Sequence, residues 1–180
     1  VALPIISAMG IETAAIPTAV LSTHTAFKNS TYRDLTNDLP KIANHWKQEK
    51  FEFDGIYTGY LGSIEQIDML KEFFKQFKTS ENFIFIDPVM ADNGKLYAGI
   101  DTNFVKEMKK LCKTADVIVP NLTEASYMLE TEYKESYSEQ EIKNMLIELS
   151  NLGPKYVVLT GVSFKKNELG VMSYNKETNK

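Results

Sequence analysis

The chain has 180 residues, of which 43% are hydrophobic and 24% are charged, and its formal net charge is −4. This composition is ordinary for a globular protein with one substantial core, and the dispersed basic residues argue against a nucleic-acid-binding surface. No apolar run reaches the roughly 18 residues that a membrane span needs. The single cysteine, Cys112, cannot form an internal disulfide, which favours a reducing cytoplasm.

The first part of the chain predicts a helix, a strand and a second helix. Residues 1–9 are apolar and end at Gly10, a common stop for a helix. Residues 14–21 are apolar and partly β-branched, as in a strand, and the polar residues 23–33 lack a period and predict a loop. Residues 39–47 place their apolar side chains at helical spacing.

Strands and helices then alternate to the end of the chain. The predicted strands are 55–59, 83–86, 116–119, 156–160 and 169–174. The predicted helices are 63–77, 101–112, 122–129 and 138–149, and capping boxes are expected at Ser63 with Gln66 and at Ser138 with Glu141. The alternation predicts a single α/β domain over residues 1–180, a three-layer sandwich whose mostly parallel sheet has helices on both faces.

Acidic and amide side chains follow two of these strands. Asp87 and Asp92 come after the strand 83–86, and Asn121 and Glu124 come after the strand 116–119. Open α/β sheets bind ligands at the carboxyl ends of their strands, and Mg²⁺ prefers carboxylates together with substrate phosphates. The pattern therefore predicts a site for Mg²⁺ and a nucleotide, as in a kinase.

Local structure offers an alternative explanation for the same residues. Asn121 and Glu124 fit a capping box at the start of a helix, and both Asp87 before Pro88 and Asp92 before Asn93 favour turns. The sequence contains neither a P-loop motif nor a dinucleotide-binding glycine motif. Both explanations stay open at this point.

Five segments resemble the pyridoxal kinases of the ribokinase-like superfamily. They are Ser22-Thr-His-Thr25, Tyr57-Thr-Gly-Tyr-Leu-Gly62, Asp87-Pro-Val-Met-Ala-Asp92, Pro120-Asn-Leu-Thr-Glu124 and Val158-Leu-Thr-Gly161. They occur in the order found in that family and extend over nearly the whole chain. The resemblance implies a ribokinase-like fold and ATP-dependent phosphorylation of the 5′-hydroxymethyl group of pyridoxal, pyridoxine or pyridoxamine. We also expect a homodimer.

The resemblance assigns roles residue by residue. His24, Thr25 and Tyr60 are expected at the vitamin B6 substrate. The residues expected at ATP are Asp87, Asp92, Val119, Asn121, Glu124 and Thr160. Asp92 and Glu124 are expected to organise Mg²⁺, and Tyr97 falls where the family has a lid segment. If Glu124 only capped a helix, its replacement by Gln would cost little stability, because Gln also serves in a capping box.

The chain also departs from the family pattern. The glycine-rich helix start that carries the catalytic aspartate of the family, and the first strand with its substrate-contacting serine, have no counterpart here. We therefore expect the catalytic base downstream of Lys180. We also expect a domain truncated at both ends that is inactive as an isolated polypeptide.

Two other functions remain open at this point. One is a hydroxymethylpyrimidine kinase of thiamine synthesis, which the resemblance implies would share the fold. The other is a non-catalytic paralogue that binds vitamin B6 without phosphorylating it.

Overall fold

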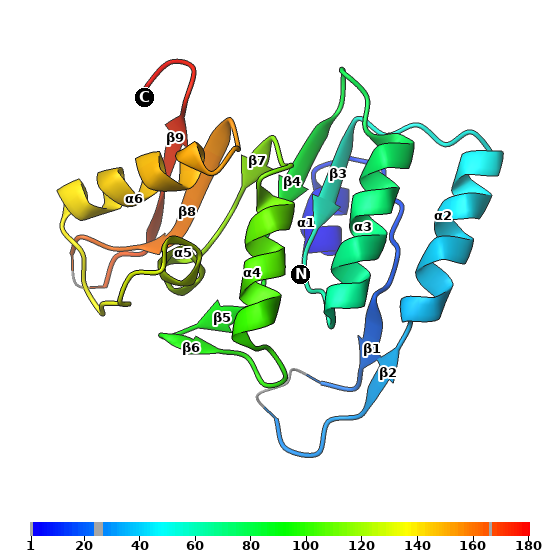
Figure 1. The fold of residues 1–180 in the computed structure, drawn as a ribbon, viewed down its shortest axis with the longest axis horizontal. Helices are drawn as coiled ribbons and strands as arrows, with labels where there is room; N and C mark the ends of the chain where they lie inside the picture. Colours follow the sequence, from blue (N-terminus) through cyan, green and yellow to red (C-terminus); the bar gives the residue numbers. More distant parts are fainter. Residues whose placement is uncertain (1, 24–26, 166) are drawn as a thin grey trace. The chain divides into compact units, whose positions relative to one another are not determined.

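A five-stranded sheet organises residues 51–180 in the computed structural model (Figure 1). The strands follow the spatial order β3-β4-β7-β8-β9, which is also their order along the chain. Their bounds are β3 Gly55–Thr58, β4 Phe83–Ile86, β7 Val117–Ile118, β8 Tyr156–Val162 and β9 Gly170–Asn175. The first four strands are parallel, and β9 runs antiparallel to β8 at one edge. The predicted α/β class with a mostly parallel sheet is confirmed.

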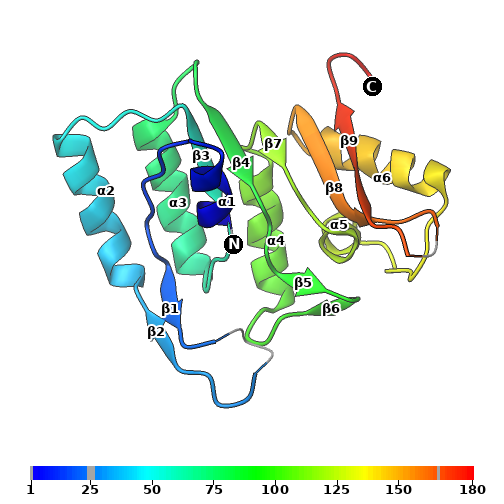
Figure 2. The same ribbon diagram turned by 180° about the vertical axis from the view of Figure 1, so that it is seen from behind.

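Four helices connect or follow these strands. They are α3 Ile64–Phe77, α4 Thr102–Cys112, α5 Leu122–Leu129 and α6 Glu139–Asn151. Helices α3, α4 and α6 cover the same face of the sheet, as the two opposite views show (Figures 1 and 2). A second helical layer, on the other face, stays a prediction.

Burial along the strands follows the pleat. On β3 and β4, Ile56, Ile84 and Ile86 are buried, whereas the alternate residues Tyr57 and Phe83 are exposed. Because successive strand residues point to opposite faces, the buried positions form one continuous apolar face. That face packs under the helices and forms the core that holds the strand ends in place.

The structure describes residues 2–23, 27–165 and 167–180, which form two compact units, residues 1–50 and 51–180. The first unit contains α1 Ala2–Ala8, a two-stranded antiparallel sheet of β1 Ala19–Leu21 and β2 Tyr32–Asp34, a short 3-10 helix Thr36–Asp38, and α2 Leu39–Gln48. None of the helices formed by the described residues has the length and apolar character that a membrane crossing needs.

Several local predictions needed correction. Residues 32–34 form β2 rather than loop, and the predicted strand 14–21 is reduced to Ala19–Leu21. The box at the start of α3 is half formed: the Ser63 hydroxyl accepts a hydrogen bond from Gln66 N, but the Gln66 side chain accepts from Gly62 N rather than from Ser63 N. The box at Ser138 is complete.

Candidate functional site

The carboxyl ends of the parallel strands gather most of the residues that the sequence predicts for the site. Those that follow or end a strand are Tyr60 after β3, Asp87 after β4, Val119 and Asn121 after β7, and Thr160 within β8. Parallel strands place their carboxyl ends at one edge of a sheet, so these residues share that edge. His24 and Thr25 lie outside the described residues.

A complete capping box begins α5, as the local explanation predicted. Asn121 Oδ1 accepts a hydrogen bond from Glu124 N at 2.9 Å, and Glu124 Oε2 accepts from Asn121 N at 2.8 Å. The same two side chains reach the loop after β4: Met90 N donates to Glu124 Oε1 at 3.2 Å, and Asn121 Nδ2 donates to the carbonyl of Ala91 at 2.8 Å. The box therefore also ties two strand ends together, which helix capping alone does not require.

Asp92 lies on a small hairpin formed by β5 Ala91–Asp92 and β6 Lys95–Leu96. Asn93 and Gly94 form its two-residue turn with φ of 49° and 76°, as the primed hairpin turns need. Gly94 N donates to Thr123 Oγ1 at 3.0 Å, and a Cβ at Gly94 would lie 2.8 Å from the ring of Tyr133. The turn is thus held against α5 and the loop beyond it, and it presents Asp92 as an exposed carboxylate.

The acidic groups at this edge lack a counter-charge within the described residues. None of the ion pairs recorded among those residues involves Asp87, Asp92 or Glu124. Burial raises the pKa of Glu124 to about 8, against the opposing effect of hydrogen bonds from the backbone of Asn121, Met90 and Ala91, and the nearby Asp87 raises it further. Burial also raises the pKa of Asp87, while the hydrogen bond from Tyr57 lowers it. A cation at this edge would stabilise the ionised form of both carboxyl groups and lower their pKa values.

The donors present fit Mg²⁺ with a nucleotide better than they fit a metal held by protein alone. No cluster of three or more His, Cys, Asp or Glu side chains able to hold a metal ion is found among the described residues. Mg²⁺ is usually bound through one or two carboxylates, with waters and substrate phosphates completing its shell. Asp92 and Glu124 meet that smaller requirement.

Two tyrosines frame the acidic edge. Tyr57 donates from its hydroxyl to Asp87 Oδ2 at 2.9 Å. Tyr97 follows β6, and burial raises its pKa, with smaller contributions from Asp92, Glu124 and Asp87. The resemblance named Tyr97, whereas sequence reasoning missed Tyr57, although it stands in one of the matching segments.

The catalytic base expected downstream of Lys180 stays a prediction. Lys180 closes a backbone turn after β9: its N donates to the carbonyl of Asn175 at 3.3 Å, and its carbonyl accepts from Asn175 N at 2.6 Å. This contact is made by the backbone and is part of the turn, so Lys180 has no place in the candidate site. The site described here therefore consists of metal-binding and substrate-binding candidates, without an assigned base.

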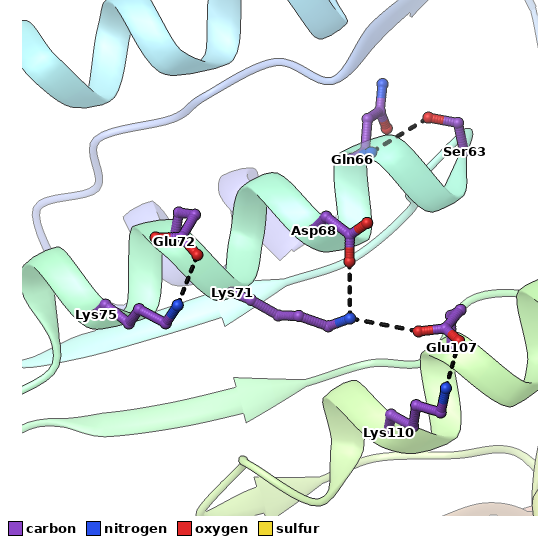
Figure 3. Close-up of polar contacts among 8 residues, drawn as sticks. All are labelled: Ser63, Gln66, Asp68, Lys71, Glu72, Lys75, Glu107 and Lys110. Carbon is purple, nitrogen blue, oxygen red and sulfur yellow. Dashed lines mark hydrogen bonds and ion pairs between the residues drawn. The ribbon is translucent and has the colours of Figure 1, made fainter.

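A wide groove of about 1010 Å³ lies elsewhere, along α3. Its lysines are held in ion pairs: Lys71 Nζ lies 2.8 Å from Asp68 and 3.4 Å from Glu107, and Lys75 Nζ lies 2.6 Å from Glu72 (Figure 3). None of the predicted site residues lines the groove. Its charges therefore neutralise one another, and we place the candidate site at the strand ends instead.

Comparison with known proteins identifies the family. The sequence profile of the family described as phosphomethylpyrimidine kinase matches residues 3–179. The chain belongs to this family. Family membership fits the geometry above, because a kinase needs anionic groups that can organise a metal ion beside its nucleotide.

Two solved structures and one curated protein illustrate the range of the relatives. A Bacteroides thetaiotaomicron protein provisionally assigned as a phosphomethylpyrimidine kinase, crystallised with pyridoxal, is 44% identical with a TM-score of 0.91 over 98% of this chain and 63% of that chain. The pyridoxal kinase of Lactobacillus plantarum is 32% identical with a TM-score of 0.85 over 99% and 63%. The hydroxymethylpyrimidine/phosphomethylpyrimidine kinase of Aquifex aeolicus is 31% identical over 121 residues, which are 66% of this chain and 45% of that protein.

The chain spans less than two thirds of the length of each of these three relatives. The relatives also divide between two substrate classes, a pyridine vitamin and a pyrimidine precursor. Fold and family are therefore shared by both classes, and the choice of substrate has to be argued from the site.

Proposed function

We propose that the intact protein uses ATP to phosphorylate the 5′-hydroxymethyl group of a vitamin B6 vitamer. The observation that carries the proposal is the acidic edge of the sheet, where Glu124 joins the Asp87–Asp92 segment to the start of α5. Phosphoryl transfer depends mainly on positioning and on neutralising charge, and this edge supplies rigidly held carboxylates for a metal-bound nucleotide. The Bacteroides relative crystallised with pyridoxal supports the pyridine vitamer as substrate.

We assign the acidic edge to the nucleotide, and the residues that the resemblance implies for the vitamer to the second substrate. Asp87, Asp92 and Glu124 face the ATP phosphates through Mg²⁺, which when bound neutralises phosphate charge. Asn121 supports the phosphates. Val119 and Thr160 lie on the nucleotide side, where Val119 N and Thr160 N are already engaged with the carbonyls of Ile86 and Pro120. His24, Thr25 and Tyr60 take the vitamer, and no residue up to Lys180 is assigned as the catalytic base.

A hydroxymethylpyrimidine kinase is the second candidate. The family description and the Aquifex aeolicus relative favour it, and the acidic edge would serve that reaction equally well. A third candidate, a paralogue that binds vitamin B6 without phosphorylating it, needs only the substrate half of the site.

The test compares substrates with the intact natural protein. We expect kcat/KM for pyridoxal or pyridoxamine to exceed that for hydroxymethylpyrimidine, measured with Mg²⁺ and ATP under identical conditions. A higher value for the pyrimidine would establish the second candidate in its place. Tight binding of pyridoxal without formation of pyridoxal phosphate would favour the third.

A further inference from the structure

Tyr57 belongs to the acidic edge but has no role in the proposed function so far. It lies on β3 beside Phe85 of β4, and its side chain is 45% exposed. Asp87 follows β4 two residues after Phe85, so the tyrosine reaches it diagonally across the two strands. The hydroxyl donates to Asp87 Oδ2 at 2.9 Å, a good distance for a bond to a carboxylate.

The surroundings of Asp87 show what this bond does for the carboxylate. Burial disfavours the ionised form of Asp87, and the hydrogen bond from Tyr57 opposes that effect. Glu124 is the neighbouring acidic group, and its pKa is raised by burial and, to a smaller extent, by Asp87. Burial, with Asp87 and Glu124, also raises the pKa of Tyr57, so its hydroxyl stays a neutral donor. An uncharged donor fixes the carboxylate without competing with a cation for it.

A purely structural role fits Tyr57 less well. The side chain lies on the face of β3 opposite to the buried Ile56 and Thr58, and it is not part of the core. A hydrogen bond from a tyrosine that is 45% exposed adds little to folding, because water replaces it readily in the unfolded chain. Its orienting effect on Asp87 is the contribution that water would not replace.

We propose that Tyr57 is a positioning residue, which holds the Asp87 carboxylate in the orientation that the metal-bound nucleotide requires. The inference rests on the proposed function in one respect, the assignment of Asp87 to the nucleotide. It predicts that Tyr57 acts only through Asp87 and does not touch the nucleotide itself.

The experiment uses Tyr57→Phe in the intact protein, with Mg²⁺–ADP as the probe and calorimetry as the readout. We expect the dissociation constant of Mg²⁺–ADP to rise about tenfold, as for the loss of a hydrogen bond to a charged group. The unfolding midpoint and KM for the vitamer should stay close to the unsubstituted values. The matched control is Tyr174→Phe on β9, the edge strand opposite to β3. It removes the hydroxyl that donates to Asn179 in the turn after β9, and it should leave nucleotide binding unchanged.

A double-mutant cycle then separates positioning from direct contact. Adding Tyr57→Phe to Asp87→Ala should weaken Mg²⁺–ADP binding no further than Asp87→Ala alone, and Asp87→Asn serves if the alanine variant does not fold. Unchanged binding in Tyr57→Phe, or a full tenfold effect in the Asp87 variant, would overturn the inference. An unsubstituted protein that binds Mg²⁺–ADP but phosphorylates no vitamer would refute only the proposed function, and one that does not bind Mg²⁺–ADP would overturn both.

Discussion

Glu124 both caps α5 and connects the start of that helix to the loop after β4 at the candidate site. Its side chain is 3% exposed, and each of its oxygens accepts a hydrogen bond from a different backbone N–H. A helix cap uses only one of these bonds. The other bond, from Met90, reaches 34 residues back along the chain. This position therefore requires two acceptor oxygens, and a glutamine in the same capping box would provide only one.

We expect Glu124→Gln to destabilise the protein by about 1–3 kcal/mol at pH 6. Even the protonated carboxyl keeps two oxygens that can accept, whereas the amide offers one acceptor and turns its NH₂ group toward a buried N–H donor. This revises the expectation from the sequence, in which Gln would replace Glu at little cost. Urea unfolding at pH 6 without metal measures the change.

Glu141→Gln is the matched control for that substitution. Glu141 occupies the same position of the capping box at the start of α6, but there the box is exposed to solvent. Water can satisfy the group that the amide leaves unpaired, and the ion pair with Lys134 that is also lost lies at the surface, where such pairs add little. The loss should therefore be clearly smaller. Equal losses in the two variants would mean that the hydrogen bond from Met90 adds nothing to the free energy of unfolding.

At the scale of elements, the turn between α6 and β8 depends on a close backbone approach. Gly153 has φ of 152°, and a Cβ at this position would lie 2.6 Å from the carbonyl oxygen of Lys113 at the end of α4. We expect Gly153→Ala to cost about 1–3 kcal/mol, because the backbone has to shift to admit the methyl group. Gly170→Ala, whose Cβ would meet its nearest atom at 3.6 Å, should change the free energy of unfolding little in the same urea titration.

The regular elements were largely predictable from the sequence. The helices at 64–77, 102–112, 122–129 and 139–151 carry apolar periodicity or caps that fix their limits to within a few residues. Strands of two or three residues, such as β2, β5 and β6, are too short for any alternation to mark them. The hairpin was visible only through the turn signal at Asn93 and Gly94.

The candidate site was predictable in its composition but not in its contacts. The carboxylates and amide could be read from segments that follow strands. The bonds from Tyr57 to Asp87 and from Met90 to Glu124 join residues 30 and 34 positions apart. Such pairs depend on how the strands, the loops after them and the start of α5 pack together, which local sequence patterns do not specify.

For the whole molecule, stability should be greatest near pH 5 when metal is absent. The pKa of Glu124 is raised to about 8, so between about pH 4.5 and pH 8 the folded state holds more protons than the unfolded state, and stability falls as pH rises. The pKa of Glu141 is lowered to about 2, mainly by Lys134, so stability also falls as pH drops from about 4.5 toward 2.

Urea unfolding from pH 3 to pH 9 in the presence of a chelator measures the loss of stability above the maximum (the alkaline limb) and below it (the acidic limb). Glu124→Gln should flatten the alkaline limb and leave the acidic limb unchanged. Mg²⁺ should reduce the alkaline loss in the unsubstituted protein only, if the ion binds the ionised carboxylate. An alkaline limb that is unaffected by the substitution would assign that loss to other groups.

The strand order of the sheet has a consequence for synthesis on the ribosome. Within the five-stranded sheet, each strand from β4 to β9 lies beside the strand of that sheet made before it. Every strand after β3 therefore emerges when its neighbour has already been translated, and none has to wait for a later segment to provide a first partner. Because chains are made at about 5–20 residues per second, far more slowly than hairpins or helices form, residues 51–175 can assemble one strand at a time as they appear.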